Sequence, residues 1–145
     1  MLNLSIFAER LDSLLFDVKL NPPAFAKILG SGRATINRYL SGLKMPTVEM
    51  TVQMADYFRV TTDFLLGLEE ENRATVFSPY IPFRERLPQI CAEFGITKYQ
   101  LQKKTGIPES AIYNWQAGRT KPTIESIVRI AEALPCPVDH VLGRE

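Results

Sequence analysis

Apolar side chains recur every three or four residues through the first half of the chain, which is the spacing of one helix face. The longest such run is residues 5–19, whose apolar positions are Ile6, Phe7, Leu11, Leu14, Leu15 and Val18. We therefore predict an amphipathic helix over residues 5–19. The same pattern predicts four shorter helices. Three cover residues 22–29, 33–40 and 62–66, and another begins at the cap Thr47 and includes Val48, Val52, Ala55 and Phe58.

Residues that favour helix ends stand between these segments. Asn21 offers an N-cap to the second helix, and Thr47 offers one to the fourth. A turn over residues 30–32 contains two glycines, and Gly42 stands where a left-handed residue would close the third helix. Alternation at period two, which would indicate a strand, is not sustained anywhere. The sequence therefore predicts an all-α fold.

The chain contains an internal repeat. A shift of 76 residues aligns residues 7–69 with residues 83–145 without a gap, and 17 of the 63 aligned pairs are identical. Ordinary residue usage would give roughly four identities. The identical pairs include Arg10/Arg86 and Gly30/Gly106. We predict two tandem domains, residues 1–69 and 83–145, joined by a linker over residues 70–82.

The second domain repeats the helix scheme of the first. Thr97 and Thr123 are predicted N-caps, Gly106 makes the turn, and further helices are expected over residues 109–117 and 138–142. The linker would span about 45 Å if fully extended. Its apolar residues either pack on a domain or form a contact surface; they are Val76, Phe77, Tyr80 and Ile81.

In each domain the second and third helices are joined by a short glycine-containing turn, as in a helix-turn-helix, whose second helix can enter a DNA major groove. Residues 20–69 and, independently, residues 96–145 resemble the phage-repressor/Cro-like (Xre) family, most specifically over residues 115–134. The resemblance implies two lambda-repressor-like five-helix domains in tandem, with double-stranded DNA as the partner.

In the first domain, the resemblance places base-contacting residues on the third helix: Arg33, Ala34, Asn37 and Arg38. Arginine can pair with guanine through two hydrogen bonds, and a small alanine suits a thymine methyl group. Lys44, in the loop that follows, is expected to contact phosphate. The domain departs from the family at Pro22 and Pro23, because prolines have no N–H to donate to a phosphate.

In the second domain, the equivalent base-contacting positions are Glu109, Ser110, Tyr113 and Asn114, and the expected phosphate contacts are Lys98, Arg119, Thr120 and Lys121. A glutamate can accept a hydrogen bond from cytosine N4, but phosphates repel it. Residues 1–69 have no net charge, whereas residues 83–145 carry +2. We therefore expect the first domain to read sequence and the second to hold the DNA backbone.

Composition and motifs argue against other classes of function. Cys91, Cys136 and His140 each align with an apolar residue of the first domain, so packing roles are expected, and no catalytic triad or glycine-rich phosphate loop is present. We expect no enzyme activity, no cofactor and no metal. No apolar run approaches the roughly 18 residues of a membrane span, and no secretory leader is evident, so a cytoplasmic protein is expected.

The function that the resemblance implies is a sequence-specific, repressor-like transcriptional regulator. It would act as a homodimer or as an intramolecular pseudo-dimer. Two alternatives stay open: an adaptor that binds protein after losing part of its DNA binding, for which Pro22 and Glu109 argue, and an antitoxin-like protein that binds both an operator and a toxin.

Overall fold

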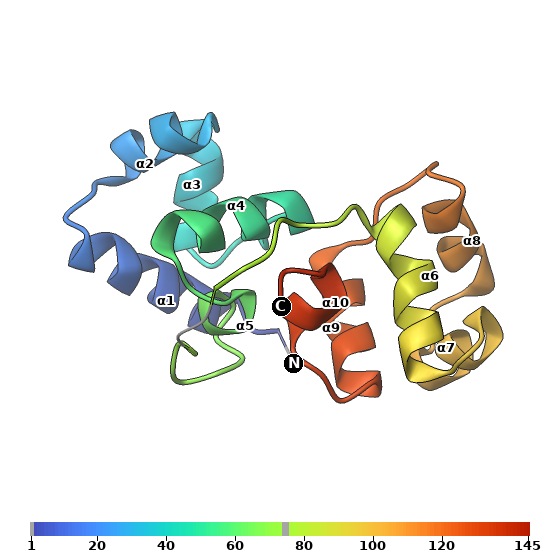
Figure 1. Ribbon diagram of the computed structural model, residues 1–145. Helices are drawn as coiled ribbons and strands as arrows, with labels where there is room; N and C mark the ends of the chain where they lie inside the picture. The colour runs from blue at the N-terminus through green and yellow to red at the C-terminus, as the bar shows by residue number, and fades with distance from the viewer. Residues whose placement is uncertain (1, 74–75) are drawn as a thin grey trace. The chain divides into compact units, whose positions relative to one another are not determined.

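The computed structural model describes residues 2–73 and 76–145, which form ten α-helices and no strand. The chain divides into two compact units, unit 1 (Met1–Ala74) and unit 2 (Thr75–Glu145). Each unit contains five helices, which confirms the predicted all-α fold (Figure 1). Within the described residues, no helix has the length and apolar character needed to cross a membrane.

The helices of unit 1 are α1 (Leu4–Asp17), α2 (Pro22–Leu29), α3 (Arg33–Leu40), α4 (Val48–Phe58) and α5 (Thr62–Leu65). Those of unit 2 are α6 (Phe83–Phe94), α7 (Lys98–Thr105), α8 (Glu109–Gln116), α9 (Ile124–Ala133) and α10 (Val138–Leu142).

The predicted N-caps are confirmed. Asn21 Oδ1 accepts a hydrogen bond from the Ala24 N–H at 2.9 Å, and Thr47, Thr97 and Thr123 cap α4, α7 and α9 in the same way. The predicted end of the first helix is two residues too late, because Lys19 has a left-handed backbone with φ of 56°.

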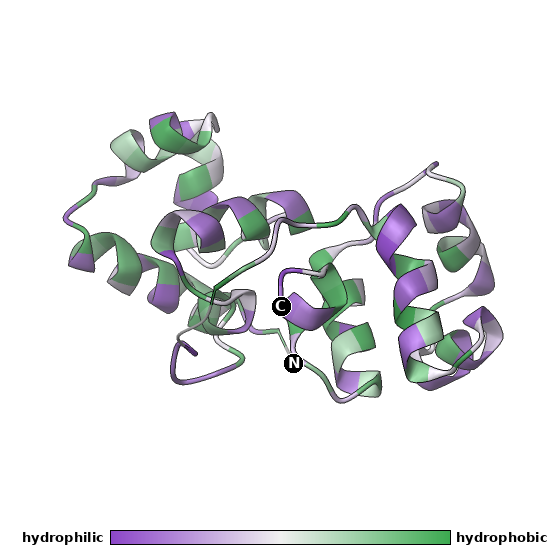
Figure 2. Ribbon diagram, viewed as in Figure 1, coloured by the Kyte–Doolittle hydropathy of each residue, from purple (hydrophilic) through white to green (hydrophobic). Residues whose placement is uncertain are grey.

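Each unit has its own apolar core, formed by the buried apolar residues of its helices. Figure 2 shows hydrophobic and hydrophilic residues interspersed along the helices. In unit 1, α1 packs on α3 and α5, and α2 packs on α3; in unit 2, α6 packs on α8 and α10, and α7 packs on α8 and α9. The same aromatic contact recurs in both cores: Phe7 meets Tyr39 edge-on at 6.0 Å, and Phe83 meets Trp115 at 5.7 Å between ring centres. The third helix of each unit is thereby fixed to the first.

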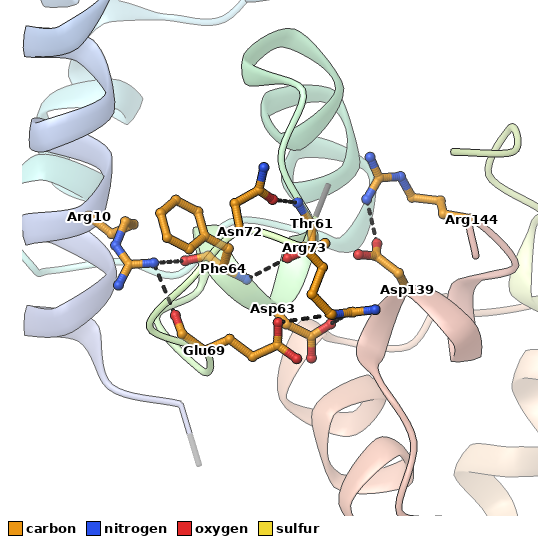
Figure 3. Close-up of polar contacts among 9 residues, drawn as sticks. All are labelled: Arg10, Thr61, Asp63, Phe64, Glu69, Asn72, Arg73, Asp139 and Arg144. Atoms are coloured by element: carbon orange, nitrogen blue, oxygen red, sulfur yellow. Dashed lines mark hydrogen bonds and ion pairs between the residues drawn. The ribbon is translucent and has the colours of Figure 1, made fainter. Parts of the chain in front are cut away.

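A repeated arginine ties the first helix of each unit to the fifth. In unit 1, Arg10 Nη1 donates to the carbonyl oxygens of Phe64 at 2.5 Å and Glu69 at 3.2 Å (Figure 3). Its guanidinium carbon also lies 3.9 Å from the centre of the Phe64 ring. The side chain therefore joins α1 to the backbone at the end of α5, where the Phe64 carbonyl also accepts from the Gly67 N–H at 3.0 Å.

In unit 2, Arg86 occupies the same repeat position and likewise joins the first helix, α6, to the backbone of the fifth, α10. Its Nη2 donates to the carbonyl oxygen of His140 at 2.6 Å, and its Nε to that of Val141 at 3.3 Å. Glu93 lies 3.5 Å from Nη2. Arg86 is buried, so these contacts are shielded from water.

The first part of the predicted linker is fixed to unit 1. Asn72 Oδ1 accepts a hydrogen bond from the Thr61 N–H at 2.9 Å (Figure 3). The Arg73 guanidinium pairs with Glu69 at 3.2 Å and lies 3.8 Å from Asp63. Contacts to unit 1 therefore continue as far as Arg73.

The last part of the predicted linker is fixed to unit 2. The Ser78 N–H donates to the carbonyl oxygen of Arg144 at 2.7 Å, and the Ile81 N–H to that of Leu142 at 3.3 Å. The Phe77 ring stacks on the Arg144 guanidinium at 4.2 Å. Of the two roles considered for the linker's apolar residues, Phe77 and Ile81 therefore take the packing role.

Candidate nucleic-acid interface

In unit 1, α2 and α3 form a helical pair joined by a three-residue turn. Gly30 ends α2 with φ of 67°, a left-handed conformation that glycine adopts without strain. Gly32 precedes the first residue of α3, and no side chain caps that helix. The two helices pack on each other, and Phe25 of α2 and Ile36 of α3 are both buried. The tight turn and the apolar contact together fix the direction of α3 relative to α2.

The outward face of α3 carries the four residues that the sequence predicted to contact bases. Arg33, Ala34, Asn37 and Arg38 are all exposed, whereas Ile36 and Tyr39 are buried. This follows from the helix period, because residues four positions apart lie on the same side of a helix and the two such pairs here are adjacent. Neither arginine forms an ion pair with any residue that the structure describes. Their ten guanidinium N–H donors remain available to a partner.

The loop after α3 presents Lys44 to solvent. Gly42 adopts φ of 70°, as predicted for the residue that closes this helix. The Leu43 N–H donates to the Arg38 carbonyl at 3.0 Å, which keeps the loop against the end of α3. Lys44 therefore adds a third positive charge beside the exposed face of α3.

The start of α2 offers no backbone donor to an anion. Pro22 and Pro23 lack an N–H group, and the next donor, the Ala24 N–H, is taken by Asn21 Oδ1. The departure noted in the sequence therefore has a structural consequence, since the N-terminus of this helix cannot bind a phosphate through its first three residues.

In unit 2, α7 and α8 form the equivalent pair. Gly106 ends α7 with φ of 71°, and Ile112 and Trp115 hold α8 in the core. Glu109, Ser110 and Tyr113 are exposed on its outer side, and Asn114 is half-buried. The predicted base-contacting positions of this unit thus also lie together on one helix face, although they carry a negative charge where α3 carries a positive one.

The predicted phosphate contacts of unit 2, Lys98, Arg119, Thr120 and Lys121, are all exposed. Lys98 begins α7, where a capping box between Thr97 and Gln100 engages the N–H groups of those two residues. The N–H groups of Lys98 and Tyr99 have no partner within the helix. Unlike α2, α7 therefore combines an exposed cation with backbone donors at its start.

The sequence did not predict a groove of about 350 Å³ between α7 and α8. Two exposed tyrosines, Tyr99 and Tyr113, line it, and the guanidinium of Arg119 lies 5.2 Å from the centre of the Tyr113 ring. The rest of the lining is Lys98, Gln102, Glu109, Ile112, Gln116 and Ala117. The spacing of apolar residues along the chain could not predict this groove. Its lining comes from the exposed sides of two helices, and that spacing indicates only which side of each helix is buried.

Cys91, Cys136 and His140, for which packing roles were expected, are each half-buried. Cys91 and Cys136 are half-buried thiols without a disulfide. Burial raises the pKa of the Cys91 thiol, and the nearby positive charge of Lys98 lowers it by less. His140 Nε2 lies 2.5 Å from Glu93 Oε1, which places the imidazole in a surface contact. Across the described residues, no group of three or more His, Cys, Asp and Glu side chains could hold a metal ion.

Comparison with protein families agrees with this geometry. The family model described as "Helix-turn-helix" matches residues 24–65 and 89–141, which together exceed half of the chain. The first match runs from α2 to the end of α5, and the second from α6 into α10. Neither curated proteins nor solved structures gave a match. Tandem domains of this kind indicate DNA binding and are typical of proteins that are not enzymes. The chain therefore belongs to the Cro-like (Xre) helix-turn-helix family, with two such domains in tandem.

Proposed function

We propose that the chain is a sequence-specific, repressor-like transcriptional regulator that uses both helix-turn-helix domains. The observation that carries this proposal is the outward face of α3, where Arg33 and Arg38 are exposed and form no ion pair with the described residues. A helix docked in the major groove would present such a face to base edges.

The residues of α3 suit particular base edges. An arginine can donate two hydrogen bonds to O6 and N7 of guanine, and Asn37 can pair with N6 and N7 of adenine. Ala34 is small enough to meet a thymine methyl group. Lys44 would neutralise a phosphate beside the groove, and contacts of this kind fix the position of the protein on the duplex.

The two units are proposed to divide the work. Unit 1 has cations on its base-facing helix and no backbone donor at the start of α2, so it is suited to read sequence. Unit 2 carries Glu109 on that face but exposes Lys98, Arg119 and Lys121 beside it, so it is suited to hold phosphates.

Binding of the full chain to random and selected duplexes tests the proposal. Specific binding should weaken steeply with salt, because each neutralised phosphate releases counterions.

Two variants test the division of work between the units. Arg38→Ala should weaken the free energy of DNA binding by about 1–3 kcal/mol and relax the preference at one guanine. Lys121→Ala should lower affinity for all sequences and reduce the salt slope by about 1. The division of work is refuted if the two variants behave alike, and DNA binding is refuted if no salt-sensitive complex forms at millimolar protein.

One observation favours the adaptor alternative for unit 2 alone. The groove between α7 and α8 is lined by Tyr99 and Tyr113, and Glu109 at its edge would be repelled by phosphates. A protein-binding or antitoxin-like role predicts a chain that co-purifies with a protein partner. In that case, Glu109→Lys should strengthen DNA binding by unit 2 and abolish the protein complex.

A further inference from the structure

The outward faces of α3 and α8 differ at every position that would meet a base. The buried faces match, since Ile36 is paired with Ile112 in the repeat and Tyr39 with Trp115. The exposed pairs are Arg33/Glu109, Ala34/Ser110, Asn37/Tyr113 and Arg38/Asn114, of which Asn114 alone is half-buried. The two helices therefore occupy equivalent positions in their units but expose side chains of different charge and hydrogen-bonding capacity.

This difference prevents the two helices from reading the same bases. Arg33 has only donors, which suit the O6 and N7 acceptors of guanine. Glu109 has only acceptors when ionised, which suit the N4 amino group of cytosine. A duplex with two identical half-sites would therefore place one of these side chains against the wrong base edge, at a cost of about 1–3 kcal/mol.

The connection between the units is short. Contacts fix the chain to unit 1 as far as Arg73 and to unit 2 from Phe77 onward. Four Cα–Cα steps of about 3.8 Å separate these two residues, so the connection spans at most about 15 Å. This is well below the 45 Å reach expected if all of residues 70–82 were free. Such a tether keeps unit 2 at a high effective concentration near any DNA that unit 1 holds.

We infer that one chain binds one continuous, non-palindromic duplex with two unlike half-sites. The half-site of α3 contains guanine. Unit 2 holds phosphates, as proposed above, and in addition reads one base, a cytosine at the position facing Glu109. This inference rests on the proposed function and specifies its ligand: an asymmetric DNA site rather than the inverted repeat that a symmetric dimer would need.

Selection of bound duplexes with the full chain, followed by native mass spectrometry of the complex, tests the inference. The expected result is a site without inverted symmetry that binds one chain per duplex. An inverted repeat with two chains would overturn the inference and leave the proposed function intact. A site that engages unit 1 alone would overturn the inference and also the proposed use of both domains, while DNA binding by unit 1 would stand. Absence of any DNA complex would instead refute the proposed function.

A graft on α8 tests the recognition chemistry. The fourfold variant Glu109→Arg, Ser110→Ala, Tyr113→Asn and Asn114→Arg leaves Ile112 and Trp115 in place, and it should convert the second half-site to the sequence of the first. The single variant Glu109→Gln should change the preferred base from cytosine to adenine, because glutamine pairs with N6 and N7 of adenine. Glu125→Gln, on the exposed side of α9, is the matched control. Unchanged selection by both α8 variants would overturn the inference.

The spacing between half-sites tests the tether. Moving them apart by one helical turn, about 34 Å, preserves their orientation but exceeds the reach of a 15 Å connection. Affinity should then fall roughly 10²-fold, to that of unit 1 alone. If the affinity were retained at this spacing, the connection between Arg73 and Phe77 would not limit the distance between the two units. That result would overturn the inference of one continuous site.

Discussion

Replacing Arg86 with methionine should destabilise unit 2 strongly. The substitution keeps an apolar stem in the core but removes the donors to the carbonyl oxygens of His140 and Val141, at 2.6 and 3.3 Å. A hydrogen bond from a charged donor contributes about 1.5–3 kcal/mol, and the longer bond falls at the low end. The expected loss is about 3 kcal/mol, a large part of the roughly 4–10 kcal/mol that a domain of this size possesses.

Urea denaturation followed by tryptophan fluorescence measures this loss selectively. Trp115 is the only tryptophan of the chain and is 5% exposed in the core of unit 2, so its emission reports the unfolding of that unit. The midpoint of the Met variant should fall by roughly 1–3 M urea.

Two further variants separate geometry from charge. Arg86→Lys keeps the cation but loses the planar fork that reaches two carbonyls, so it should lose about half as much stability. Arg129→Met, at an exposed position of α9, should stay within about 0.5 kcal/mol of the parent. The reasoning fails if Arg86→Met matches that control, or if the Lys variant is as stable as the parent.

Three other predictions follow from single residues. Burial raises the pKa of Tyr39, so the neutral phenol stabilises unit 1, and this stability should be lost as pH rises above about 10, through the folded-state pKa. Tyr39→Phe should flatten that alkaline loss in urea titrations at pH 8 and 10.5, and equal slopes would contradict the assignment. Thr97→Ala breaks the capping box of α7 and should cost about 1 kcal/mol, seen as a lower Trp115 midpoint, whereas an unchanged midpoint would show that the cap is dispensable. Because burial raises the pKa of Cys91, its alkylation at pH 8 should be much slower in the folded chain than in urea; equal rates would count against this.

The helices could be predicted from sequence because their signals are local. A cap such as Asn21 bonds to a residue three positions away, and glycine at residue 30 ends a helix through its own backbone conformation. The bounds of α3 were therefore correct at both ends. Lys19 marks the limit of this reasoning, since nothing in its side chain indicates a left-handed backbone. Its aligned partner in the repeat, Gly95, was the available signal, with φ of 62°.

The contacts that organise each unit could not be predicted in this way, because they join residues far apart in the sequence. Arg10 reaches carbonyls 54 and 59 positions away, and the repeat showed only that this arginine recurs as Arg86. The outward placement of Arg33 and Arg38 was expected from the family resemblance, and the helix period with the buried Ile36 accounts for it.

The division of residues 70–82 between the units bears on how the gene can be dissected. A fragment that stops at residue 69 would lack Asn72 and Arg73, and one that begins at residue 83 would lack the Phe77 stack on Arg144. Each excised half would expose surfaces that the intact chain covers, and it could precipitate or misfold for that reason alone. Fragments cut at the limits of the sequence repeat would thus be less stable than fragments that keep these contacts, and each unit would be judged less able to fold alone than it is.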